Sequence, residues 1–217
     1  MTGTPPPSPP HTGAPVDHTD GRIVRGDSRR AAILEAATRE FGRRGYETAR
    51  IADIARASGV TDAGLLHHFS TKRDLFLAVI ELREQVYAPI QDRPPATARE
   101  FFDGFIASVV RAARDPDLLR FRTMLTGANG LVGHPAYGRA HRRLKAALEG
   151  LEPFLRAAID RGELRADTDP HQVVLELFAL NDGLRSQWAA WPEVVDYAET
   201  FTVAANALYE RIAARQP

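Results

Sequence analysis

The 217-residue chain contains no cysteine. A disulfide framework, a thiolate zinc site and a cysteine nucleophile are therefore excluded, and the composition permits a reducing compartment. Long apolar runs are also missing, since no stretch reaches the roughly 18 residues of a membrane span. The N-terminal residues lack the basic start and apolar core of a secretory signal. From these absences we expect a protein that stays in the cytoplasm, without membrane attachment.

The chain also lacks net charge, because 28 Lys and Arg residues balance 28 Asp and Glu residues. These charges are unevenly distributed along the sequence. Residues 22–74 hold eleven basic and seven acidic side chains, a balance of +4, which leaves −4 for the remainder. A basic module joined to a mildly acidic one is typical of a phosphate-binding part attached to a sensing part.

Catalytic motifs are the third absence. Phosphate loops, dinucleotide-binding glycine loops and the His-Glu-x-x-His zinc motif are all missing from the sequence. The adjacent His67 and His68 diverge by about 100° around a helix, which makes them a poor metal chelate. The sequence therefore predicts no catalytic residue, no metal and no cofactor, and an enzyme is the least favoured class.

Apolar residues recur with helical spacing along most of the chain, and no stretch alternates as a strand would. Residues 1–21 differ, because they hold six prolines and few large apolar side chains, which predicts a disordered arm. We expect an all-α chain of about nine helices. It would comprise an N-terminal three-helix domain over 22–75 and a C-terminal helical bundle over 76–217. The bundle helices are predicted near residues 96–114, 117–126, 135–161, 170–190 and 193–214.

The N-terminal helices have clear boundary signals. The first is predicted to begin at a cap near Asp27 or Ser28 and to stop at Gly45. Short helices follow over 50–58 and 61–69, joined by a tight turn that contains a glycine. A longer helix opens at Thr71, whose spacing to an acidic residue three positions on is that of a capping box, and runs toward Pro89. The short pair describes a helix-turn-helix, whose second helix enters the DNA major groove.

Within this region the order and spacing of short motifs resemble the N-terminal domain of the TetR family of transcriptional regulators. The motifs are Ile33–Ala37, Phe41, Gly45–Thr48, Ile51–Ala55, Ser58–Thr61, Gly64-Leu65, His68-Phe69 and Lys72–Leu75. The resemblance implies a ligand-responsive regulator, usually a repressor, that binds double-stranded operator DNA as a homodimer. It also implies that Thr48 and Lys72 anchor phosphates, Lys72 at a helix start whose N–H groups add positive field. The DNA-binding residues expected from groove geometry and the resemblance together are Thr48, Arg50, Thr61, Asp62, Ala63, Gly64, Leu66, His67, His68 and Lys72.

Some of these roles stay open. Arg50 could lie along a phosphate or pair with a guanine edge. The family commonly has a tyrosine at the position of Leu66, and its hydroxyl holds a phosphate that leucine cannot bind. We hypothesise that His67 or His68 takes over this contact, while Leu66 and Ala63 offer apolar surface to a thymine methyl group.

Four arginines precede or open the first helix, and they could form a basic arm that enters the minor groove. For Arg29 and Arg30, a minor-groove contact and a solvated flank are equally open interpretations. For Arg22 and Arg25 we favour the solvated flank. A protein that keeps the fold as an activator or as an interaction module without DNA binding is the alternative function. The missing tyrosine favours the interaction module, and Lys72 argues against it.

The C-terminal half resembles the corresponding domain of a large TetR subgroup in the motifs Gly133–Tyr137, Arg142–Leu144, Gly162–Asp167 and Asp182–Trp188. Its last two predicted helices carry wide apolar faces, more than one core needs. We therefore expect a four-helix interface across a two-fold axis, as the resemblance also implies. The residues assigned to it are Leu177, Leu184, Trp188, Phe201 and Leu208.

A pocket for a small-molecule effector is expected between the middle helices, with plain core packing as the alternative. Its predicted lining is Phe102, Phe105, Phe121, Met124, Leu125, Phe178, Asn181 and Asp182. Polar groups on an apolar helix need partners if they are buried. Asn181 and Asp182 could therefore bind ligand, hydrogen-bond across the dimer or cap a kink at Gly183. For His134 and His141 we favour a structural role.

Overall fold

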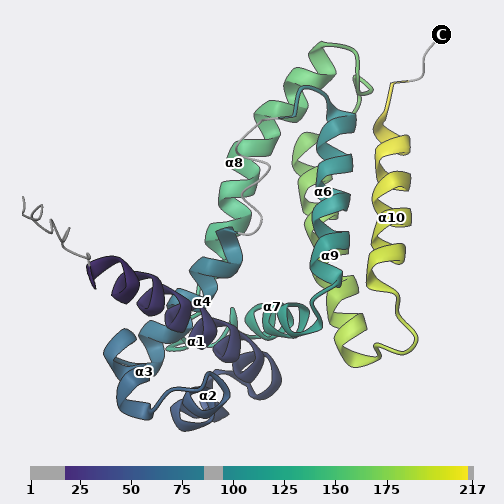
Figure 1. Cartoon of the computed structure of the whole chain (residues 1–217). Helices are drawn as coiled ribbons and strands as arrows, with labels where there is room; N and C mark the ends of the chain where they lie inside the picture. Colours follow the sequence, from purple (N-terminus) through teal and green to yellow (C-terminus); the bar gives the residue numbers. More distant parts are fainter. Residues whose placement is uncertain (1–17, 86–94, 215–217) are drawn as a thin grey trace, which may run out of the picture.

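A computed structural model describes residues 18–85 and 95–214 of the chain. These residues form nine α-helices and no strand, apart from one isolated bridge between Leu164 and Ala213. The all-α prediction is therefore confirmed. The helices are α1 (His18–Thr48), α2 (Ile51–Ala57), α3 (Asp62–His68), α4 (Lys72–Gln85), α6 (Ala98–Ala113), α7 (Pro116–Ala128), α8 (Arg139–Asp160), α9 (Pro170–Ala190) and α10 (Tyr197–Ile212). Figure 1 shows α1–α3 gathered at one end, with α6, α9 and α10 side by side.

The boundaries of α1 differ from the prediction at one end only. The helix begins at His18, so the predicted start at Asp27 or Ser28 is wrong. Asp and Ser favour caps but cost only a few tenths of a kcal/mol inside a helix, too little to stop one. The helical path is interrupted at Gly45 (φ 74°, ψ 171°), as expected. The predicted disordered arm covers residues 1–21, and this prediction is wrong for residues 18–21, which are helical. Residues 1–17 and the side chains of Arg22 and Arg25 lie outside the described residues.

Side-chain caps fix the later helix starts. Thr97, Asp115, Asp169 and Asp196 each accept a hydrogen bond from a backbone N–H in the first turn of the helix that follows. Such caps satisfy N–H groups that have no partner within the helix. Asp196 explains why α10 begins at Tyr197 and not at residue 193. The part of α4 predicted beyond residue 85 lies outside the described residues.

The N-terminal helices α1–α4, here called the head, share one apolar core. Buried side chains from all four helices meet in it, including Phe41, Ile54, Leu65 and Phe76. Helix α7 also contributes Phe121, and α1 approaches it closely: a Cβ added at Gly42 would lie 3.0 Å from the Phe121 nitrogen. The head therefore packs against α7 without a gap.

The helices α6–α10, here called the body, have a second core. It buries Phe101, Phe102, Leu155, Val174, Leu177, Phe201 and Leu208 among other apolar side chains. Three of these, Leu177, Phe201 and Leu208, are at most 5% exposed. Their assignment to a dimer interface is therefore corrected, since they pack inside their own subunit. Within the described ranges, no helix is long and apolar enough to cross a membrane.

Candidate nucleic-acid interface and ligand cavity

The turn between α2 and α3 is built by local hydrogen bonds. The Ser58 hydroxyl donates to the Ile54 carbonyl at 2.8 Å, and the Val60 N–H donates to the Ala55 carbonyl at 3.0 Å. Gly59 between them has a φ of 70°, which favours glycine. Thr61 then caps α3 by accepting a hydrogen bond from the Gly64 N–H at 3.1 Å. Both short helices and their tight turn are as predicted from the sequence.

Helix α3 buries one side chain and leaves the opposite side open. Leu65 is fully buried in the head core, whereas Asp62, Ala63, Leu66 and His67 are exposed. Leu66 keeps 45% of its surface accessible, so its side chain can contact a partner. The open side of α3 is therefore available to a partner.

The other two predicted residues of α3 are less accessible. His68 is half-buried, and its ring centroid lies 5.8 Å from that of His67. Gly64 is half-buried, and a Cβ there would lie 3.2 Å from the Thr61 hydroxyl oxygen. Gly64 therefore serves the cap of α3.

The first residue of α4 is hydrogen-bonded to the end of α1. The Lys72 Nζ donates to the Glu47 carbonyl at 2.9 Å and lies 4.8 Å from the centroid of the Tyr46 ring. Thr48 is exposed next to this contact, and Arg50 is exposed in extended backbone just before α2. The structure thus brings Lys72 beside Thr48, although the two are far apart in sequence.

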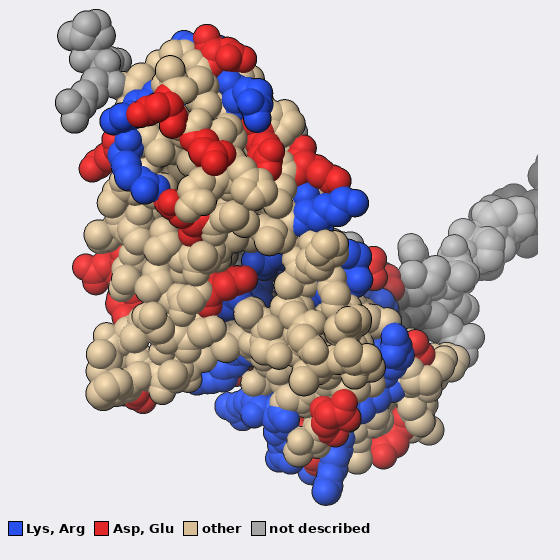
Figure 2. Space-filling view, turned by 180° about the vertical axis from the view of Figure 1, so that it is seen from behind, with Lys and Arg blue, Asp and Glu red and all other residues tan. Residues whose placement is uncertain are grey.

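Further basic side chains surround this surface. The Arg30 guanidinium lies over the Phe69 ring at 5.1 Å, directly after α3. Arg44 pairs with Glu40 and Asp53 at 3.1 and 3.8 Å, and Arg56 pairs with the same aspartate at 3.1 Å. Figure 2 shows blue side chains gathered over the lower part of the molecule. Basic surface beside an open helix fits a phosphate-bearing partner.

A ring cluster joins the head to the body. His134, in the segment before α8, lies 5.2 Å from the Tyr46 ring and 5.6 Å from the Phe76 ring. Its Nδ1 accepts a hydrogen bond from the Ala136 N–H at 3.1 Å. Burial lowers the pKa of His134, with a smaller opposing effect from Glu47. His134 therefore packs as a neutral residue, in the structural role that was favoured.

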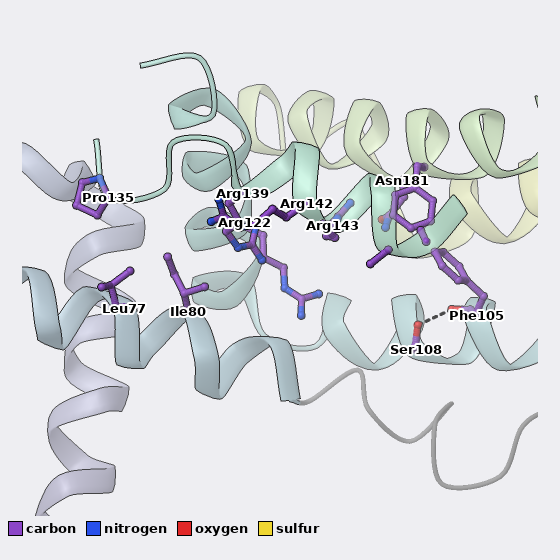
Figure 3. A pocket seen from close by; sticks show the side chains of 13 residues that line it. Leu77, Ile80, Phe105, Ser108, Arg122, Pro135, Arg139, Arg142, Arg143 and Asn181 are labelled. Atoms are coloured by element: carbon purple, nitrogen blue, oxygen red, sulfur yellow. Dashed lines mark hydrogen bonds between the residues drawn. The ribbon is translucent and has the colours of Figure 1, made fainter. Parts of the chain in front are cut away.

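A cavity of about 530 Å³ lies between the head and the body helices, within the usual range for small-molecule sites. It is shown in Figure 3 and draws side chains from α4, α6, α7, α8 and α9. Its lining consists of Leu77, Ile80, Phe105, Ser108, Arg122, Pro135, Arg139, Arg142, Arg143, Ala146, Ala147, Phe178 and Asn181.

Three of the eight residues predicted for the pocket line this cavity, namely Phe105, Phe178 and Asn181. The expectation is wrong for the core residues Phe102, Phe121 and Leu125, which are at most 2% exposed. Met124 packs against the head core, and Asp182 pairs with arginines beside the cavity. Helical spacing alone does not separate core side chains from cavity side chains, because both faces are apolar.

Four arginines line the cavity that the sequence analysis did not predict there. Arg139, Arg142 and Arg143 follow one another on α8 at spacings that place them on one helical face. This spacing is visible in the sequence and could have indicated that the three arginines share one side of the helix. The fourth, Arg122 on α7, donates to the Arg83 carbonyl of α4 at 2.9 Å.

Asn181 and Asp182 of α9 have partners inside the subunit. Asn181 accepts a short hydrogen bond from the Tyr197 hydroxyl, and both side chains are buried. Asp182 pairs with Arg143 at 3.1 Å and with Arg185 at 2.8 Å. Helix α9 runs without interruption through Gly183. Among the described residues, no group of three His, Asp or Glu side chains could hold a metal ion.

Comparisons with known proteins agree with this geometry. Residues 33–79 match the family model of bacterial regulatory proteins of the tetR family. The regulator YezE of Bacillus subtilis, whose own function is uncharacterized, is 31% identical over 146 residues, covering 64% of this chain and 75% of YezE. The regulator TtgR of Pseudomonas putida is 28% identical over 181 residues, covering 77% of this chain and 83% of TtgR.

A solved structure extends the likeness to the body. A protein of Saccharomonospora viridis, described as a transcriptional regulator in complex with choline, is 25% identical with a TM-score of 0.67. The match covers 87% of this chain and all of that protein. The fold and the relatives thus define a helix-turn-helix transcriptional regulator and not an enzyme. The chain belongs to the TetR family of bacterial regulatory proteins.

Proposed function

We propose that the protein is a homodimeric repressor that binds a palindromic operator and is released from it by a small molecule. It would act in the cytoplasm, where bacterial DNA lies. DNA contacts are assigned to Thr48, Arg50, Lys72 and the open side of α3. Lys72 and Thr48 would hold phosphates, and residues of α3 would face base edges.

One observation carries this proposal: a single helix serves both sites. Helix α4 begins with Lys72 beside the DNA-binding surface, and its Leu77 and Ile80 line the cavity. A ligand that displaces these two side chains would move the start of α4 and the head packed on it. In a dimer such a shift changes the separation of the two α3 helices, which must match half-sites about 34–36 Å apart.

The dimer is assigned to the outer faces of α9 and α10. A shallow groove on α9 is lined by the small or apolar residues Ala179, Leu180, Gly183 and Leu184, with Glu176 and Gln187 beside them. Val203 on α10 is 65% exposed. Small residues let helices approach closely, and exposed apolar faces mark protein contacts. Leu184 and Trp188, which are half-buried, are also assigned to this interface.

Capture of genomic DNA fragments by the purified protein, followed by footprinting, tests the proposed function. We expect a palindromic footprint whose affinity falls steeply as salt rises, because bound phosphates release counterions. A reporter fused to the footprinted promoter separates repression from activation. If no fragment is retained at low salt, DNA binding is ruled out and the interaction module is favoured.

Light scattering of a Leu184→Glu variant tests the interface. We expect the wild-type protein to be a dimer and the variant a monomer, because a buried unpaired carboxylate is costly. Val132→Glu is the matched control, since Val132 is 85% exposed outside α9 and α10. A variant that stays dimeric would contradict the assignment.

A further inference from the structure

The cavity combines a charged side with an apolar side. Four guanidinium groups lie among its lining side chains, and the described residues of that lining include no carboxylate. Figure 3 shows Arg122, Arg139, Arg142 and Arg143 close together in the middle of the site, with Phe105 and Asn181 at one end. Neutral effector sites need few charged groups, so this density of cations calls for a specific kind of ligand.

One carboxylate beside the cavity pairs with two arginines. Asp182 is shared between Arg143 and Arg185, so two guanidinium groups divide one carboxylate. Among the side chains that the structure describes, none forms an ion pair or hydrogen bond with the Arg142 guanidinium, and Arg142 is exposed at the edge of the cavity. Burial, followed by the nearby Arg185, Arg143 and Arg139, lowers the pKa of Arg122. The neighbouring arginines thus disfavour the charged form of Arg122.

We propose that the effector is an organic anion, with one acidic group held by Arg142 and Arg143 and an apolar body against Phe105 and Phe178. This inference rests on the proposed function, since it names the class of ligand for the same cavity. Arginine suits the task because its planar guanidinium binds carboxylate or phosphate oxygens in pairs. Asn181 at the apolar end supplies one further polar contact for orientation.

The opposite charge is disfavoured by the same side chains. Choline, found in the Saccharomonospora viridis structure, is a cation, and aromatic faces are what usually receive such groups. In this chain the Arg143 guanidinium already lies over the Phe178 ring at 5.0 Å. A quaternary ammonium would have to displace that cation and approach the other arginines.

A matched series of decyl compounds tests the charge requirement by calorimetry on the full-length protein without DNA. The probes are decanoate, decan-1-ol and decyltrimethylammonium, which share one apolar chain and differ in charge. We expect decanoate to bind about tenfold to a hundredfold more tightly than the alcohol, and the ammonium compound to bind least. Equal or tighter binding of the alcohol or the ammonium compound would overturn the proposal, as would absence of decanoate binding.

The double variant Arg142→Gln, Arg143→Gln assigns the effect to the cavity. It should lose about tenfold or more of the decanoate affinity while decan-1-ol binding is unchanged. Arg156→Gln is the matched control, because Arg156 is also exposed on α8 but lies outside this cavity. If the double variant unfolds, the single Arg142→Gln variant at the exposed edge decides. Undiminished decanoate affinity in the variants would overturn the assignment.

Failure of this inference and failure of the proposed function give different results. A protein that binds its footprinted operator but prefers the neutral or cationic probe contradicts the anion proposal alone. A protein that binds decanoate but retains no genomic fragment contradicts the repressor proposal alone.

Discussion

The head and the body both use arginine, but in different surroundings. In the head, the side chains of Arg43 and Arg56 are 67% and 78% exposed. In the body, those of Arg143 and Arg185 are 34% and 2% exposed. At about 0.1 M salt, interactions between exposed charges more than about 10 Å apart are largely screened, whereas interactions between charges in a cavity are screened much less. Under the proposed roles, the exposed arginines of the head suit a salt-sensitive contact with DNA, and the less exposed Arg143, which lines the cavity, suits a small anion.

The two regions differ in the chemistry of their charged side chains, but their apolar side chains pack together. The head core includes Phe121 of α7, and the cavity includes Leu77 and Ile80 of α4. A body side chain thus belongs to the head core, and two head side chains line the cavity. A change at their contact should disturb both, whereas a change within one charged set should disturb only one.

The largest expected effect is at the contact itself. Phe76 is fully buried, and its ring lies 4.9 Å from Phe41, 5.9 Å from Phe121 and 5.6 Å from His134. Phe76→Ala should lower the free energy of unfolding by about 3–5 kcal/mol, measured by urea denaturation. Phe154→Ala, a half-buried ring on α8, is the control and should cost less. Equal losses would mean that the head–body contact is loosely packed.

A glycine pair tests the close approach of α1 to α7. A Cβ at Gly42 would lie 3.0 and 3.1 Å from backbone atoms of α7, so Gly42→Ala should destabilise the fold by about 1–3 kcal/mol. Gly104 in α6 has nothing within 4 Å of the same position. Gly104→Ala should therefore stabilise the protein by about 0.5–1 kcal/mol. Thermal unfolding compares the two, and a neutral Gly42→Ala would contradict the close packing.

Removal of both histidines of α3 tests whether one of them contacts a DNA phosphate. His67→Ala, His68→Ala should weaken binding to the footprinted operator by about fivefold to tenfold, if one ring replaces the missing tyrosine hydroxyl as a phosphate contact. Adding Leu66→Tyr to this variant should restore affinity. Fluorescence anisotropy measures all three proteins. Unchanged affinity in the double variant would reject the hypothesis.

The smallest effect concerns pH at the contact. Burial lowers the pKa of His134, so the unfolded chain takes up a proton at a higher pH than the folded one. Stability from the neutral ring is thus complete above the ordinary value of about 6.5 and is lost as pH falls through it toward the lowered value. His134→Gln keeps an acceptor and should flatten this dependence in urea denaturation. An equally steep loss in the variant would assign it to other groups.

The head could be predicted almost completely because its signals are local. The turn at Gly59, the Thr71 cap and the stop at Gly45 depend only on neighbouring residues, and all three are observed. The start of α1 could not be predicted, because a cap residue inside a helix costs too little to end it.

The body was predicted as helices but not as a site. An apolar stripe does not reveal whether a side chain faces its own core, a cavity or a partner, and tertiary packing decides that. Phe105 lines the cavity, while Phe102 three residues earlier is buried in the core. Leu177 and Phe201 likewise belong to the subunit core, although their spacing matched an interface. The spacing of the arginines on α8 is visible in the sequence, but only the folded structure shows that they line a cavity.

The salt dependence of operator binding tests the separation of the two arginine sets most directly. It compares the wild-type protein, Lys72→Ala, and the double variant Arg142→Gln, Arg143→Gln. We predict that Lys72→Ala lowers the slope of log affinity against log salt by about one, while the double variant keeps the wild-type slope. If the cavity variant also loses slope, its arginines contact DNA phosphates, and the division of roles between head and body is wrong.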